Sequence, residues 1–175
     1  MITRISSLNT VALFALVLGS SASSIAVAAE SAGSAVPQSG IVTAKSAYPM
    51  PETIARLKQD IADKGIKFFI EVDQSKLAAD AGITVRPSTL LIFGNPPLGT
   101  LFIAANPLAG LDWPVRLLVF QDEKGDVWTA YTDFAYIARR HEIKGMDTAA
   151  FDKASGVIAS ITSSVSAKTS SASVK

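Results

Sequence analysis

The chain has 175 residues, no cysteine and one histidine, and its sixteen Lys and Arg side chains face fifteen Asp and Glu side chains, for a formal net charge of +1. Without cysteine it cannot form a disulfide, a thiolate nucleophile or a cysteine-ligated metal site. The lone His141 excludes a site built from several imidazoles, and the near-neutral charge argues against nucleic acid as a partner. We therefore expect no cofactor, no metal and no nucleic acid.

The first 28 residues predict a signal peptide. Arg4 gives a positive start, residues 11–18 form an apolar run, and Ala26 and Ala28 fit the small-residue pattern of a cleavage site. A membrane-spanning helix needs about 20 predominantly apolar residues, which is far more than this run offers. We expect export to the periplasm or the medium, with no stable membrane insertion after cleavage. A retained N-terminal anchor is the alternative.

Composition divides the rest of the chain into one domain and two flanking segments. Residues 29–39 are small and polar and predict a flexible lead-in. Residues 166–175 contain only Ser, Ala, Lys, Thr and Val without periodicity, which predicts a disordered tail. The domain is expected over residues 40–165.

The first half of the domain alternates strands with helices. We expect strands at residues 41–48, 66–72 and 89–93. The first helix begins at the prolines of residues 49–51 and places Ile54, Leu57 and Ile61 on one face. In the second strand, Phe68, Ile70 and Val72 are expected to share a face. A short helix capped by Asp73 or Ser75 then ends at Gly82.

A strand–turn–helix unit follows at Asn95. Asn95 is a favourable N-cap, and Pro96 suits the first helical position. A helix start after a strand can bind an anion through free N–H groups, but Pro96 and Pro97 lack two of them. A rigid turn is therefore the preferred interpretation.

The second half predicts a hairpin and terminal helices. Strands at 115–120 and 127–131 are joined by the acidic segment 122–126, which fits a turn better than a calcium loop. One helix ends near His141, and a last helix carries an apolar stripe. The stripe consists of Phe151, Ala154, Ile158, Ile161 and Val165. Periodicity alone leaves open whether it covers its own sheet or a second copy of the chain.

These elements predict an α+β fold. The expected architecture is a single two-layer domain with a mixed β-sheet of about five strands, covered mainly on one face by helices, in the order β-α-β-α-β-α-β-β-α.

The middle of the chain resembles the domain-of-unknown-function family DUF302. The resemblance covers about residues 40–142 and rests on the order and spacing of several short segments. These are Val72-Asp73, Pro87, Leu90 to Pro96, Gly99-Thr100, Asn106-Pro107, Leu111 to Pro114 and Val127-Trp128. It implies one compact domain, a homodimer and no established activity. Many members carry His where this chain has Gln74, so a site that needs this imidazole is not expected here.

The function favoured by the sequence is a non-catalytic, small-ligand-binding or sensing module of the cell envelope. The hypothesis assumes that the Asn95 turn, the 111–114 loop and the end of the hairpin converge on one concave site. The candidate ligand-binding residues are Asp73, Asn95, Asp112, Trp113, Tyr131 and His141, with Phe93 and Trp128 as apolar wall. No catalytic residue is assigned.

Each candidate also has a structural explanation, and two other functions stay open. Asn95 and Asp73 can act as helix caps, the tryptophans as core, and His141 as a surface group at a charged helix end. One alternative function is a homo-oligomeric assembly protein. The other is an enzyme with His141, Asp73 or Asp112 as its base, although no nucleophile elbow, dinucleotide fingerprint or P-loop is present.

Overall fold

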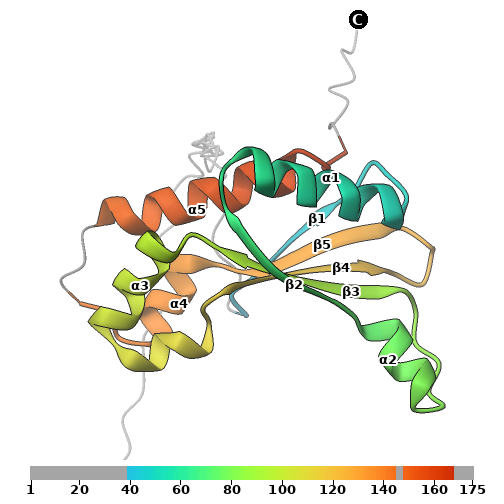
Figure 1. Ribbon diagram of the computed structural model, residues 1–175, viewed down its shortest axis with the longest axis horizontal. Coiled ribbons are helices and arrows are strands. Elements are labelled where there is room, and N and C mark those ends of the chain that lie inside the picture. The colour runs from blue at the N-terminus through green and yellow to red at the C-terminus, as the bar shows by residue number, and fades with distance from the viewer. Residues whose placement is uncertain (1–38, 145–147, 168–175) are drawn as a thin grey trace, which may run out of the picture. The chain divides into compact units, whose positions relative to one another are not determined.

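The computed structural model describes residues 39–144 and 148–167, and every statement on the fold refers to these residues (Figure 1). Its elements are β1 (Ile41–Lys45), α1 (Met50–Asp63), β2 (Lys67–Asp73), α2 (Gln74–Asp80), β3 (Ser88–Gly94), α3 (Pro96–Ala105), the 3-10 helix η1 (Pro107–Leu111), β4 (Val115–Gln121), β5 (Val127–Thr132), α4 (Phe134–Arg140) and α5 (Thr148–Ser163). The predicted signal peptide lies outside the described residues, as do most of the predicted lead-in and tail. Ser166, assigned to the tail, still pairs with Ser46 at the end of β1.

The five strands form one sheet in the order β1-β5-β4-β3-β2. The α+β class, the five strands and the cover by helices are confirmed. The expectation of a mixed sheet is wrong, because all four strand pairings are antiparallel. The reason is that α1 joins β1 and β2, which lie at opposite edges of the sheet and do not pair with each other.

Helices α1 and α5 pack together over one face of the sheet (Figure 1). This face holds the fully buried residues of β3 and β4, which are Leu91, Phe93, Leu117 and Val119. Leu57 and Ile61 of α1, and Ile158 and Ile161 of α5, complete the core. The apolar stripe of the last helix therefore covers its own sheet, which settles the alternative that periodicity left open.

Strand β2 contains an irregularity that changes which residues share a face. Its register against β3 shifts between Phe68 and Ile70. Phe68 is paired with Phe93 and packs against the core, whereas Ile70 is paired with Ile92 on the opposite face. A bulge adds one residue and reverses the alternation, so the prediction that Phe68 shares a face with Ile70 and Val72 is wrong.

The β4–β5 hairpin is closed by its own carboxylate. Asp122 accepts hydrogen bonds from the backbone N–H groups of Lys124 and Asp126 and from Nε1 of Trp128, each at 2.9 Å. Desolvation alone would raise the pKa of Asp122, but these hydrogen bonds outweigh it and lower the pKa. The acidic segment thus stabilises the turn through the hydrogen bonds of Asp122, which also hold the indole of Trp128 beside the hairpin.

At the other end of the sheet, Trp113 packs against two glycines. Its ring lies on Gly94, where a Cβ would come within 2.6 Å, and still closer on Gly99 in α3. Two segments of the family resemblance, the turn at residues 93–96 and residues 112–114, therefore meet in one contact. Asn95 caps α3 between them by accepting from the N–H of Leu98.

Two Gly→Ala substitutions in helices, one at this contact and one in open space, should have opposite effects on stability. Ala normally stabilises a helix relative to Gly by about 0.5–1 kcal/mol. Gly99→Ala is expected to lower the free energy of unfolding by about 1–3 kcal/mol, because the methyl group overlaps the Trp113 ring. Gly156→Ala in α5 has open space and should be stabilising. Urea unfolding followed by circular dichroism measures both, and a gain in both variants would contradict the tight contact.

Candidate functional site

The structure divides the six candidate residues between the two ends of the sheet. In the antiparallel β2–β3 pair, Lys67 lies opposite Gly94 and Asp73 opposite Thr89. Asp73 is therefore at the far end of the sheet from Asn95, which directly follows Gly94. The other candidates, Asp112, Trp113, Tyr131 and His141, belong to the Asn95 end.

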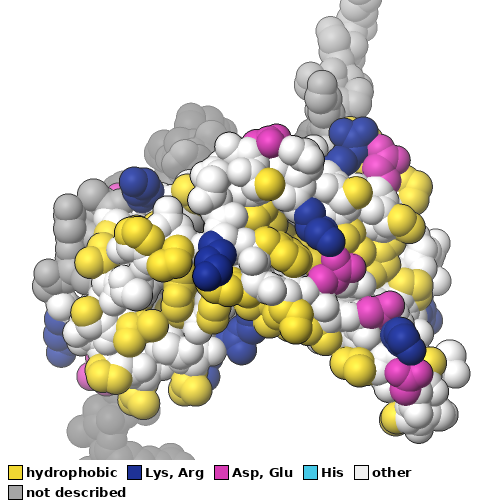
Figure 2. Space-filling model, in the orientation of Figure 1, with side chains coloured by type: hydrophobic (Ala, Val, Ile, Leu, Met, Phe, Trp, Pro, Cys, Tyr) yellow, Lys and Arg dark blue, Asp and Glu magenta, His cyan; other side chains and the backbone are white. Residues whose placement is uncertain are grey.

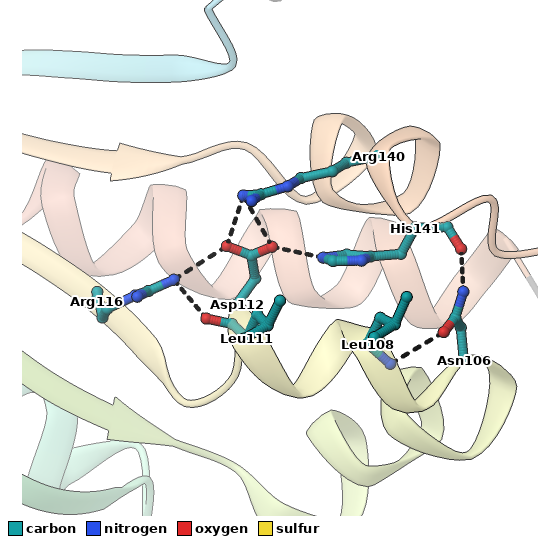
Figure 3. Close-up of polar contacts among 7 residues, drawn as sticks. All are labelled: Asn106, Leu108, Leu111, Asp112, Arg116, Arg140 and His141. Carbon is teal, nitrogen blue, oxygen red and sulfur yellow. Dashed lines mark hydrogen bonds and ion pairs between the residues drawn. The ribbon is translucent and has the colours of Figure 1, made fainter.

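Asp112 and His141 form the centre of a buried polar cluster (Figure 3). The Asp112 carboxylate is 3% exposed, and its Oδ2 lies 2.5 Å from Nε2 of His141, whose side chain is 5% exposed. Arg116 donates to Oδ1 at 3.0 Å, and Arg140 donates to the carboxylate at 3.3 Å. The expectation that His141 lies at the surface is wrong. Its neighbours in the sequence are charged, but its partner comes from a segment 29 residues earlier.

The cluster holds the η1–β4 connection against the end of α4. Asn106 reinforces it by donating from Nδ2 to the carbonyl oxygen of His141 at 2.6 Å. The space beside Asp112 measures only about 10 Å³, roughly one water molecule. A general base must come within hydrogen-bond distance of its substrate. Asp112 and His141 are too deeply buried for a substrate to reach them. The geometry therefore fits a structural role, in which the cluster joins the η1–β4 connection to the end of α4. We call this cluster the buried clasp.

Asn95 and Trp113 also come together, but around little space. The cavity that they line with Phe93 and other core residues measures about 30 Å³. Asn95 also borders a second hollow of about 540 Å³ between α3 and α5, together with Lys64 and Lys153. A concave site in which all the predicted loops meet is not present among the described residues.

Tyr131 and Trp128 have separate surroundings. Tyr131 is half-buried on β5, opposite Leu117. Burial, and then the negative charge of Asp133, raise the pKa of its phenol, so the ring carries no charge at neutral pH. Trp128 lies at the hairpin end of β5, beside Asp122.

A larger hollow is at the Asp73 end of the described domain. A groove of about 1140 Å³ runs between α1 and the sheet. It is lined by the loop that leads into α1, the first part of α1, the end of β2, the start of β3 and the β4–β5 hairpin. Figure 2 shows this side of the molecule, with hydrophobic side chains gathered below α1 and charged side chains beside them.

A buried hydroxyl pair fixes the helix above the groove. Ser46 Oγ and Thr53 Oγ1 are 2.7 Å apart, and the N–H of Tyr48 donates to Ser46 Oγ at 3.1 Å. The entry of α1 is thereby tied to the end of β1. The upper wall of the groove includes Tyr48, Met50 and Ile54, which are partly buried apolar side chains.

The charges along the groove are mostly negative. Of the lining residues, Lys58 is the single base, and Glu71, Asp73 and Asp126 are the acids. Lys58 Nζ bridges to Glu71 at 2.7 Å. Asp126 is paired with Lys45, at 2.6 Å. The groove therefore keeps the carboxylate of Asp73 as its main uncompensated charge.

Local hydrogen bonds hold Asp73 in its ionised form. Its Oδ1 accepts from Oγ of Ser75 at 2.7 Å and from the N–H of Lys76 at 2.9 Å, which caps α2. The Ser75 bond first, and then the Lys76 bond, lower the pKa of Asp73. The next residue, Gln74, accepts from Oγ of Ser88 at 2.7 Å, which ties α2 to β3.

Apart from Asp73, the residues of the groove were not identified from the sequence. They come from α1, β2, α2, β3, β4, β5 and the loops between them, and each has an ordinary local role. One signal was available at Lys58. Arg56 and Lys64 of the same helix have acids four residues before them, whereas Lys58 has none at that spacing. A basic side chain without a helical partner indicates a partner elsewhere, which here is Glu71.

The fold and the site define a small two-layer α+β domain with an antiparallel sheet, helices packed on one face and a groove beneath one of them. Residues 42–161 match the family described as "Domain of unknown function DUF302", and the chain belongs to this family. A crystal structure of an uncharacterized conserved DUF302 protein from Bacillus stearothermophilus has the same fold. Its TM-score is 0.63 at 18% identity, over 72% of this chain and 98% of that one.

Curated relatives add a second kind of match. The chain is 38% identical over 105 residues to "Fluoride-specific ion channel FluC 1" of Brucella suis, which covers 60% of this chain and 41% of that protein. The match to "Fluoride-specific ion channel FluC 2" of Brucella melitensis has the same identity and covers 39% of that protein. The chain thus spans about two fifths of the length of these relatives. No helix in the described part of the chain is long and apolar enough to cross a membrane.

The buried clasp predicts a large effect for a small substitution. Asp112→Asn keeps the shape but removes the charge that holds Arg116, Arg140 and His141, so we expect it to lower the free energy of unfolding by about 2–4 kcal/mol. Asp80→Asn is the matched control, because Asp80 forms an exposed ion pair with Lys76 and should change stability by less than about 0.5 kcal/mol. Urea unfolding measures both, and equal small effects would contradict the clasp.

Proposed function

We propose that this chain is a small-ligand-binding module of the cell envelope and that its ligand lies in the groove beneath α1. The observation that carries the proposal is the groove itself. Its volume of about 1140 Å³ is as large as the pockets that hold small molecules, which measure roughly 300–1,000 Å³. Export rests on the signal peptide predicted from residues 1–28.

The chemistry of the groove favours a neutral or positively charged organic ligand. The apolar wall formed by Tyr48, Met50 and Ile54 suits a hydrocarbon or aromatic body. Asp73 supplies an ionised carboxylate, and a charge-assisted hydrogen bond to it is stronger than a neutral one. Thr89 and Gln121 add neutral polar groups to the lining. An amine with an apolar body satisfies all three features.

The relatives named as fluoride channels raise the question of an anionic ligand. We propose that the segment of 105 residues shared with them has the same binding role in both, and that fluoride is not the ligand of the groove. The uncompensated carboxylate of Asp73 repels an anion, and the single base of the lining, Lys58, is already paired with Glu71.

A matched pair of probes tests the proposal. Benzylammonium and benzoate have similar size and opposite charge. We expect benzylammonium to shift the amide NMR signals of residues 46–59, 71–75 and 121–127, and benzoate and sodium fluoride to leave them unchanged. Asp73→Asn should weaken benzylammonium binding by about 10-fold, because it removes the negative charge that the ammonium group faces. Asp80→Asn, outside the groove, should have no effect.

The pH dependence gives a second check on the role of Asp73. Its pKa lies below the ordinary value of 3.8, so the carboxylate stays charged over the whole neutral and mildly acidic range. Benzylammonium affinity should therefore be constant from about pH 8 to pH 5 and fall only in stronger acid. Equal binding of benzoate, or full binding by Asp73→Asn, would contradict the proposal.

A further inference from the structure

The second hollow, between α3 and α5, is separate from the groove beneath α1. Its volume of about 540 Å³ lies within the range of pockets that hold small molecules, which is roughly 300–1,000 Å³. It shares no lining residue with the groove. A ligand of this hollow is therefore independent of the ligand proposed for the groove.

The floor of the second hollow is apolar and belongs to the core. It is formed by Ile66, Leu98 and Val157, which are buried or partly buried and pack in the hydrophobic core. The same three side chains line the small cavity beside Trp113 from its other side. Figure 2 shows hydrophobic side chains between α5 and α3, with basic side chains beside them. Such a floor suits a hydrocarbon chain.

The charges of the second hollow are positive, in contrast to those of the groove. Its charged lining residues are Lys64 and Lys153, and no carboxylate is part of the lining. Lys64 is held at 2.6 Å by Asp60, which lies outside the lining. Lys153 is exposed and takes part in none of the ion pairs of the described residues. An anion is attracted to this hollow, chiefly by Lys153.

Neutral polar side chains add hydrogen-bond donors. Asn95 uses Oδ1 to cap α3, by accepting from the N–H of Leu98, so its Nδ2 remains able to donate to a ligand. Pro96 and Pro97 have no N–H groups, so the start of α3 offers an anion little through its backbone. Ser160 contributes a hydroxyl to the lining. Side chains, rather than a helix terminus, therefore supply the polar groups.

Gly156 keeps the second hollow open. It lies inside α5, where Gly destabilises a helix relative to Ala. A Cβ at this position would meet nothing within 4 Å, so packing does not require a glycine. Gly156 does line the hollow, where a larger side chain would occupy the space. Access to the hollow is a physical reason for a glycine that the helix itself disfavours.

We infer that the second hollow binds a small carboxylate with an apolar chain. The carboxylate lies at Lys153 and Asn95, because a charge-assisted hydrogen bond is stronger than a neutral one. The chain lies on the floor of Ile66, Leu98 and Val157, where it is removed from water. An inorganic anion cannot use this floor, and an organic cation meets the charge of Lys153.

Three probes of different charge and shape test the inference on the full chain by amide NMR. Hexanoate has the required carboxylate and chain, hexylammonium has the same chain with a positive charge, and sulfate has no chain. We expect hexanoate to shift the signals of residues 64–66, 95, 98 and 153–160, and the other two to leave them unchanged. Hexylammonium is expected to shift the signals of the groove instead, so the same spectra test the two sites separately.

Two variants with matched controls test the roles of the charge and the glycine. Lys153→Gln should weaken hexanoate binding by about 5-fold, as expected for one exposed charge, whereas Lys124→Gln in the hairpin turn should not change it. Gly156→Leu should weaken binding by at least about 10-fold, because its side chain fills the hollow. Ala159→Leu, at an exposed position of α5 outside the lining, should not. Circular dichroism checks that all four variants fold.

Three results would overturn the inference. The first is an absence of these shifts at tens of millimolar hexanoate. The second is an equal response to hexylammonium or to sulfate. The third is undiminished hexanoate binding by folded Lys153→Gln and Gly156→Leu. None of these results bears on the groove, whose signals come from residues 46–59, 71–75 and 121–127.

Discussion

The packing of α1 and α5 over one face of an antiparallel sheet is the constraint on which the rest of the structure depends. Strand alternation sends Leu91 and Val119 to this face, where both helices exclude water from them. The same alternation sends Leu90 and Leu118 to the other face, which α1 and α5 do not cover. The sheet is apolar on both sides, so the single layer of helices leaves hydrophobic surface that an aqueous environment disfavours.

The two ends of the sheet differ in how tightly they are closed. At one end, Trp113 fills the space beside Gly99, and Asp112 draws His141 and two arginines into a buried cluster. At the other end, α1 is joined to β2 by the ion pair of Lys58 with Glu71, and a groove stays open beneath it. Binding sites need accessible space as well as polar groups, and this end of the sheet supplies both.

The residues that identify the family are largely those of the closed end. The glycines at 94 and 99 are required because the Trp113 ring takes the space of a side chain, and Asn95 is required as a cap. Family motifs of this kind report packing and turn chemistry. They locate the fold in a sequence and carry little information on what the protein binds, which explains why the resemblance withheld a function.

The sequence by itself determined the strands, the helices and their caps, because these depend on residues within a few positions of one another. Asn95 and Asp73 were recognisable as caps, and the apolar period placed Ile158 and Ile161 on one face of a helix. Only the tertiary structure decided which strands are neighbours and where the bulge in β2 reverses its faces. It also decided that His141 is buried against Asp112, because long-range pairing follows from how the chain packs as a whole, which no local pattern records.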